Sequence, residues 1–148
     1  MANPLFFERL NPSIGTVLAL LLSSPMVLLA ALPFDQTLAF ILAVLVPSTL
    51  LMLAFRLAPT ISLSHDALRI GKMTLPISAL GEATFLEGDE AIFERGPGLS
   101  PGSQRLFRGD INTVVKVLIS DPQDPTEYVL FSSRRGAELV SALDANRA

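Results

Sequence analysis

The chain has 148 residues, a formal net charge of −3 and 50% hydrophobic residues. Its mean hydropathy of +0.50 is high for a soluble domain. The absence of cysteine excludes disulfides, thiolate metal sites and cysteine nucleophiles. Lys and Arg form no basic cluster, and because binding to phosphates needs concentrated positive charge, we expect no nucleic-acid partner.

The first twelve residues mix large apolar side chains with Glu8 and Arg9. This composition suits a short segment that lies at the level of the lipid headgroups, and we predict an interfacial N-terminal segment over residues 1–12. A frayed terminus is the alternative interpretation.

Two uncharged runs follow, one between Arg9 and Asp35 and one between Asp35 and Arg56. A hydrocarbon core of roughly 30 Å needs about twenty helical residues at about 1.5 Å per residue, and each run is long enough. The sequence therefore predicts a two-helix transmembrane hairpin over residues 13–56. A signal peptide fits the first run poorly, because that run is long and a second one follows at once.

Small side chains recur at four-residue spacing along one face of each run: Gly15, Ala19 and Ser23 in the first, and Ala39, Ala43 and Pro47 in the second. The short turn makes the helices antiparallel neighbours, and we expect these two faces to meet. Pro25 and Pro47 each free a backbone carbonyl, which a nearby Ser or Thr hydroxyl can satisfy. A kink lining a cavity is the alternative to this structural role, but no ionisable residue lies inside either run.

The basic residues near the ends of the spans lie on one side of the hairpin. Arg9, Arg56, Arg69 and Lys72 flank the outer ends, and the turn between the runs has no Lys or Arg. The bias predicts a multi-pass protein of the cell membrane with both termini cytoplasmic, and the lipid bilayer is then its first partner.

Residues 57–148 read as a cytoplasmic domain of short strands. Alternating apolar residues and turn signals predict strands over 60–64, 67–70, 72–75, 81–87, 105–107, 113–120 and 127–132. A short helix capped by Asp89 runs to about Arg95, and a last helix over about 135–145 covers an open end of the sheet. The predicted fold class is a membrane α-helical hairpin followed by a small, mainly antiparallel β domain, pleckstrin-homology-like, with a C-terminal helix.

Several short stretches carry a resemblance to a known family: Phe7 to Leu10, Arg95 to Gly98, Arg108 with Gly109, and Asp121 to Tyr128 followed by Ser132 to Arg135. On these stretches the chain resembles a family of small actinobacterial membrane proteins of unknown function, which have two N-terminal transmembrane helices and a C-terminal bacterial pleckstrin-homology-like domain. The resemblance covers nearly the whole length and implies no activity and no cofactor.

The best candidate contact for an anion or a partner is a Gly/Pro-rich loop over residues 96–103. Arg95, Arg105 and Arg108 flank this loop, and guanidinium groups can converge there with backbone donors. Salt bridges to neighbouring acids are the alternative use of these arginines.

Other polar residues have simpler structural explanations. Asp121 and Asp124 belong to two Asp-Pro pairs, which are typical of turns. The acidic residues around 87–94 are explained by solvated charges at a helix N-terminus more simply than by a metal site. His65 lies in a tight turn, and a catalytic role for it is not indicated. We predict no catalytic residues, no metal and no cofactor.

Three classes of function remain at this stage. The favoured one is a non-enzymatic, membrane-tethered interaction or scaffolding module, whose partner is another membrane or cytoplasmic protein. The alternative is binding of an anionic lipid or a small ligand by the cytoplasmic domain. An enzyme comes third, because the sequence contains no recognisable pair of nucleophile and base, no set of metal ligands and no phosphate-binding loop.

Overall fold

The computed structural model describes residues 3–148, and the chain divides into two compact units. One unit is Asn11–Ala58. The other combines the residues up to Leu10 with Pro59–Ala148. The first unit is therefore an insertion within the second, which the sequence did not indicate.

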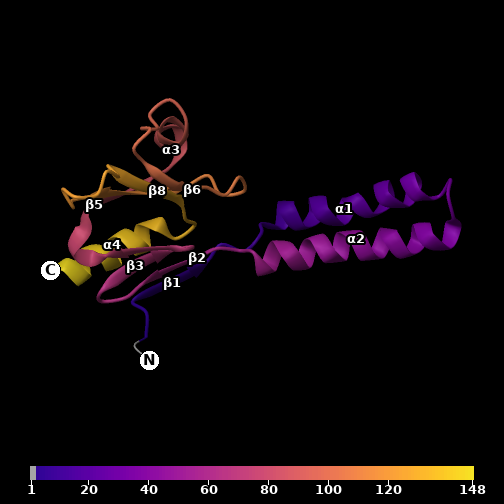
Figure 1. Ribbon diagram of the computed structural model, residues 1–148, viewed down its shortest axis with the longest axis horizontal. Coiled ribbons are helices and arrows are strands. Elements are labelled where there is room, and N and C mark those ends of the chain that lie inside the picture. The colour runs from indigo at the N-terminus through magenta and orange to yellow at the C-terminus, as the bar shows by residue number, and fades with distance from the viewer. Residues whose placement is uncertain (1–2) are drawn as a thin grey trace. The chain divides into compact units, whose positions relative to one another are not determined.

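The inserted unit is a helical hairpin of α1 (Ile14–Ala31) and α2 (Gln36–Arg56) (Figure 1). Ser13 and Asp35 cap the two helices, because their side chains accept hydrogen bonds from the backbone N–H groups of Thr16 (3.2 Å) and Leu38 (2.7 Å). Both helices are long and apolar enough to cross a membrane. Their boundaries agree with the predicted runs to within a few residues.

The face of α2 that packs on α1 is the predicted one, and the face of α1 is not. Ala39, Ala43 and Pro47 are the buried residues of α2, whereas Ala19 of α1 is exposed. The partly buried face of α1 instead includes Leu20. One small face suffices for close approach, because larger side chains of the other helix can fill the space above it.

A hydrogen bond between the helices explains how Pro47 is accommodated. Proline lacks the N–H that would normally bond the carbonyl four residues earlier, which here belongs to Ala43. The hydroxyl of Ser24 on α1 donates to that carbonyl at 2.7 Å. A serine in the neighbouring helix therefore replaces the missing backbone donor, as the sequence predicted in general terms.

The first sheet has four antiparallel strands in the order β1-β2-β3-β4: β1 (Phe6–Arg9), β2 (Thr60–Leu63), β3 (Ala67–Ile70) and β4 (Met73–Pro76). The pairing of β1 with β2 brings Arg9 opposite Thr60, and the N–H of Leu10 bonds the carbonyl of Pro59. Residues Phe6–Arg9 of the segment 1–12, for which the sequence predicted an interfacial position, thus form an edge strand of this sheet, and residues 1–2 of that segment lie outside the described residues. The side chains of β1 alternate between the core and solvent.

The second sheet has the order β5-β7-β8-β6: β5 (Leu80–Leu86), β7 (Val114–Ile119), β8 (Tyr128–Ser132) and β6 (Gln104–Leu106). A short 3-10 turn, η1 (Ile77–Ala79), leads into β5. The pair of β6 with β8 is parallel, so this sheet is mixed. α3 (Gly88–Arg95) lies between β5 and β6 in the chain, and its N-cap is Glu87 rather than the predicted Asp89.

Both sheets and the last helix share one core. The helix α4 (Gly136–Arg147) contacts β2, β5 and β7, so it covers an open end between the sheets (Figure 1). Fully buried residues of this core come from both sheets and from α4: Ile61, Leu63, Leu68, Val115, Val117, Phe131, Leu139 and Leu143. A second, smaller cluster packs Ala91 of α3 against Tyr128 and Leu130.

Candidate functional site

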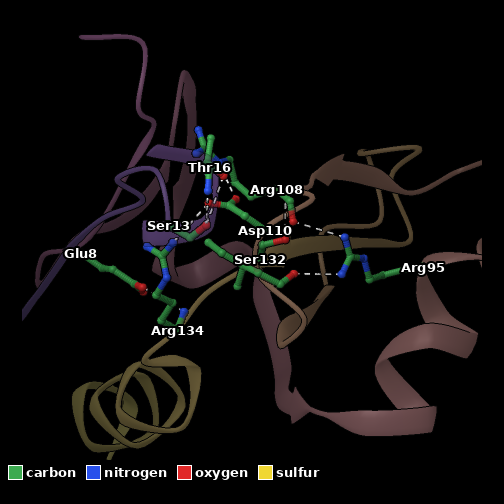
Figure 2. A network of polar contacts seen from close by, with 9 residues as sticks. Glu8, Ser13, Thr16, Arg95, Arg108, Asp110, Ser132 and Arg134 are labelled. Atoms are coloured by element: carbon green, nitrogen blue, oxygen red, sulfur yellow. Dashed lines mark hydrogen bonds and ion pairs between the residues drawn. The ribbon is translucent and has the colours of Figure 1, made fainter. Parts of the chain in front are cut away.

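Arg95, the first of the three candidate arginines, is bound to the backbone of a neighbouring loop. Its guanidinium donates to the carbonyl oxygens of Ile111 (2.9 Å) and Arg108 (3.3 Å), and it lies 5.2 Å above the ring of Phe107. Figure 2 shows these two hydrogen bonds as dashed lines. Arg95 therefore connects the end of α3 to the loop that precedes β7.

Arg108 forms an ion pair with an acid two residues away. Its Nε lies 3.2 Å from Asp110, and Nη2 of Arg134 lies 3.4 Å from the other oxygen of the same carboxylate (Figure 2). The side chain of Asp110 is only 14% exposed. One carboxylate thus faces two guanidinium groups, which is the salt-bridge use that the sequence left open for these arginines.

Arg105 differs from the other two arginines. It lies on the edge strand β6 with an exposed side chain, and within residues 3–148 it makes no ion pair. The structure brings Arg95 and Arg108 together through a backbone contact, and among the described residues no bond joins either of them to Arg105.

The loop over residues 96–103 is tied down by β8 and the residue before it. The hydroxyl of Tyr128 accepts from the N–H of Ser100 (2.8 Å) and donates to the carbonyl of Gly98 (3.4 Å), and Ser100 Oγ donates to Glu127 (2.9 Å). Leu99 packs against the smaller core cluster. Despite its glycines and prolines, the loop is therefore held by specific contacts.

A buried carboxylate that the sequence did not single out ties β1 to the end of β8. Glu8 is 6% exposed, and it accepts a hydrogen bond from the hydroxyl of Ser133. It also accepts one from the N–H of Arg134 (2.9 Å) (Figure 2). Next to it, Arg135 donates to the carbonyl of Phe7 and to Glu138. The hydrogen bond to Glu138, with the charges of Glu138 and Glu8, raises the pKa of Arg135.

A comparison with known families finds a match that covers most of the chain. A family described as protein of unknown function (DUF3093) matches residues 5–143. The chain belongs to the DUF3093 family. The match runs from β1 into α4, so it spans the helical hairpin as well as both sheets. Neither the curated proteins nor the solved structures compared with the chain provide a match.

In this DUF3093 protein the remaining polar candidates have local structural roles. Asp121 accepts from the N–H of Gln123 (2.9 Å), and Asp124 accepts from the N–H of Thr126 (2.8 Å), which lowers the pKa of Asp124. His65 lies 3.0 Å from the side chain of Asn146. Within residues 3–148, no group of three or more His, Asp or Glu side chains is arranged to hold a metal ion.

The sequence reasoning missed two exposed apolar residues on α3. Ile92 is 67% exposed and Phe93 is 56% exposed, whereas the preceding residue, Ala91, is fully buried. Adjacent residues on a helix point about 100° apart, so a buried Ala91 directs its two successors away from the core. Two adjacent bulky apolar residues within an acidic segment are the sequence signal for this exposed pair.

Proposed function

We propose that this DUF3093 protein is an integral membrane protein in which α1 and α2 both cross the bilayer. In this proposal the two-sheet domain is a non-enzymatic interaction module on the cytoplasmic side. The observation that carries the proposal is the insertion of the apolar hairpin between two paired strands, β1 and β2. A domain connected to a hairpin on both sides by a few residues is a tethered domain.

The exposed surface of the hairpin supports the membrane assignment. Ile14, Met26 and Val44 are each more than two-thirds exposed, and no residue of α1 is buried. Soluble monomers rarely expose apolar patches larger than a few hundred Å². Hydrocarbon suits such side chains because they are apolar. It also suits the helical backbone, whose N–H and C=O groups bond one another within the helix.

The pairing of β1 with β2 also supports a common side for the two termini. Residues before α1 and after α2 belong to one folded unit, so two complete crossings return the chain to the side where it began. The Lys and Arg bias near the outer ends of the helices favours the cytoplasm for that side.

Our proposal also includes a pleckstrin-homology-like fold for the two-sheet domain. Two four-stranded sheets around one core, with a C-terminal helix over their open end, support it. Two features are additions to a pleckstrin-homology-like fold. One is β1, which precedes the hairpin in the chain, and the other is the parallel pair of β6 with β8.

Engagement of the polar side chains in internal contacts favours an interaction module over an enzyme. Arg95 bonds backbone carbonyls, Asp110 bridges two arginines, and Glu8 holds the end of β8. Each group stabilises the fold at the position where it lies. The exposed apolar side chains of α3 supply the contact surface that such a module needs.

Arg105 supports the second candidate, binding of an anionic lipid headgroup by the domain. Its charge is exposed, and within the described residues no acid neutralises it. Native mass spectrometry of the full chain with added phosphatidylglycerol tests this function. If it is correct, Arg105→Glu lowers the fraction of lipid-bound protein and Lys72→Glu, another exposed basic position, does not.

Cysteine labelling tests the proposed topology, since the chain has no cysteine of its own. Single cysteines are placed at Gln36, the first residue of α2, and at Ser141, in α4. An impermeant thiol reagent on intact cells should label position 36 and should label position 141 only after lysis. Labelling of position 141 alone on intact cells would reverse the orientation, and labelling of both would remove the two crossings.

A further inference from the structure

Two large apolar side chains on α3 face solvent in the two-sheet domain. Ile92 and Phe93 are each more than half exposed, although the helix is anchored to the core by Ala91. Burial of large apolar side chains is favourable, so a partner that covers both residues would gain a stabilisation that folding of this chain leaves unused. We call Leu86, Asp89, Glu90, Ile92, Phe93 and Glu94 the α3 surface.

The ring of Phe93 is held in place. A Cβ atom at Gly98 would lie 2.5 Å from Cε1 of Phe93, so one side of the ring packs directly against the glycine. The N–H of Gly98 also donates to the carbonyl of Phe93 at 2.8 Å. An aromatic side chain whose ring is already restricted by packing on one side loses less entropy on binding than a free one, which is a property of the residues that dominate interface energies.

An open groove of about 480 Å³ runs beside this ring, and its rim is acidic. It is lined by Leu86, Phe93 and the carboxylates of Asp89, Glu90 and Glu94. Within residues 3–148, Asp89 and Glu90 take part in no ion pair, while Glu94 pairs with Lys116 at 3.1 Å.

The basic residue of the same helix does not offset this charge at the groove. Arg95 directs its guanidinium to the carbonyls of Ile111 and Arg108. The α3 surface therefore combines an apolar centre with a negative rim on which, among the described residues, Asp89 and Glu90 have no ion-pair partner.

We propose that the α3 surface binds a basic amphipathic peptide segment of a partner protein. Apolar side chains of that segment pack on Phe93 and Ile92, and its Lys or Arg residues pair with the acidic rim. Charge complementarity decides between the occupants: a second copy would bring the same negative rim, and an anionic membrane would be repelled. The inference rests on the proposed interaction module and names the chemistry of its partner.

Synthetic peptides test the proposal with the full chain in a non-ionic detergent. Three labelled amphipathic peptides share the same apolar positions and carry Lys, Gln or Glu at all polar positions. Binding is followed by fluorescence anisotropy against a detergent blank. The Lys peptide should bind at least about tenfold more tightly than the Gln peptide, the Glu peptide should bind least, and added salt should weaken the Lys complex.

Matched variants assign the binding to this surface. Phe93→Ser should lower the affinity for the Lys peptide by about tenfold or more, and Phe7→Ser, at a similarly exposed phenylalanine of β1, should leave it unchanged. Reversal of the rim by Asp89→Lys with Glu90→Lys should transfer the preference to the Glu peptide. Thermal unfolding of each variant separates lost binding from lost folding.

Three outcomes would overturn the inference. They are equal binding of the three peptides, a Lys complex that Phe93→Ser leaves intact, and an α3 surface whose substitution changes only the self-association of the chain. The proposed function is tested independently of these results, because the cysteine labels report topology without any peptide. A reversed topology would move the module to the other side of the membrane and leave the peptide preference in place.

Discussion

At the scale of single residues, Glu8 connects the first strand to the last. It lies opposite Ile61 in the register of β1 with β2, on the side of the strand that faces the core. Its carboxylate there accepts bonds from Ser133 and from the backbone of Arg134. A carboxylate in such a position stabilises because both of its oxygens are satisfied, and its removal leaves donors without partners.

We therefore expect Glu8→Ala to destabilise the two-sheet domain. An orphaned buried donor costs about 1–3 kcal/mol, so loss of the partner of both Ser133 and Arg134 should lower the free energy of unfolding by about 2–6 kcal/mol. Chemical denaturation of the full chain in detergent, followed by the fluorescence of Tyr128, measures the change. Glu8→Gln keeps one acceptor and should cost less than Glu8→Ala.

The neighbouring residue supplies the control for this prediction. Phe7 lies on the same strand with its side chain exposed, and Phe7→Ala should change the stability by less than about 0.5 kcal/mol. If the two alanine variants unfold alike, Glu8 does not connect β1 to the end of β8. Sequence reasoning could not foresee the role of Glu8, because a charged residue next to Arg9 resembles a solvated pair and its burial depends on a strand partner some fifty residues away.

At the scale of elements, the packing of α1 on α2 depends on the bond from Ser24 to the carbonyl of Ala43. We expect Ser24→Ala to destabilise the hairpin by about 0.6–1.7 kcal/mol, which spans the average and the maximum found for hydrogen bonds between helices in membranes. In a Pro47→Ala background the restored N–H can bond the same carbonyl, so Ser24→Ala should then cost less. A double-mutant cycle on thermal unfolding in detergent measures the coupling.

Ser23 provides the matched control for the cycle. Its hydroxyl bonds Leu20 of its own helix, so Ser23→Ala should show no coupling to Pro47→Ala. A coupling for Ser23 as large as that for Ser24 would contradict the assigned role. The sequence indicated that hydroxyls satisfy the freed carbonyls. The identity of the donor depends on which face of α1 is turned toward α2, and the small residues at four-residue spacing predicted the wrong face.

The start of α4 is packed too closely for any side chain larger than hydrogen. A Cβ atom at Gly136 would lie 2.6 Å from atoms of Phe85 on β5 and of Val115 on β7. We expect Gly136→Ala to lower the free energy of unfolding by about 1–3 kcal/mol, because α4 must then move away from both strands. Gly109→Ala is the control, since a Cβ atom there meets nothing within 4 Å. Equal stability of the two variants in denaturant titrations would contradict this account of how α4 seals the core.

The elements themselves were largely predictable and their pairing was not. Charge gaps of at least twenty residues indicated α1 and α2, and alternation placed β3 at Ala67–Ile70, as the structure has it. Turn residues separated most of the remaining strands. The parallel pair of β6 with β8 and the pairing of β1 with β2 join segments that no local pattern relates, because each depends on chain closure over a long separation.

At the scale of the whole molecule, the hairpin is an insertion that the two-sheet domain should not need for folding. Arg9 and Thr60 are already paired, and Leu10 bonds Pro59, so the ends of the insertion lie side by side within one sheet. A strand pair of this kind is ordinarily closed by a loop of a few residues. The helical hairpin thus occupies the position of a β-turn.

We expect a chain in which about four Gly and Asn residues replace residues 11–58 to fold as a soluble domain. A fragment of residues 59–148 alone should be much less stable, because it lacks Glu8 and the buried side chains of Phe6 and Leu10, each of which contributes about 1.5–3 kcal/mol. Circular dichroism during heating compares the two, and the bridged chain should unfold cooperatively at the higher temperature. Mixing the fragment with a synthetic peptide of residues 3–10 should restore part of the difference. Identical melting of the fragment and the bridged chain would show that β1 is dispensable, and the sheet would then begin at β2 with the hairpin as a simple N-terminal anchor.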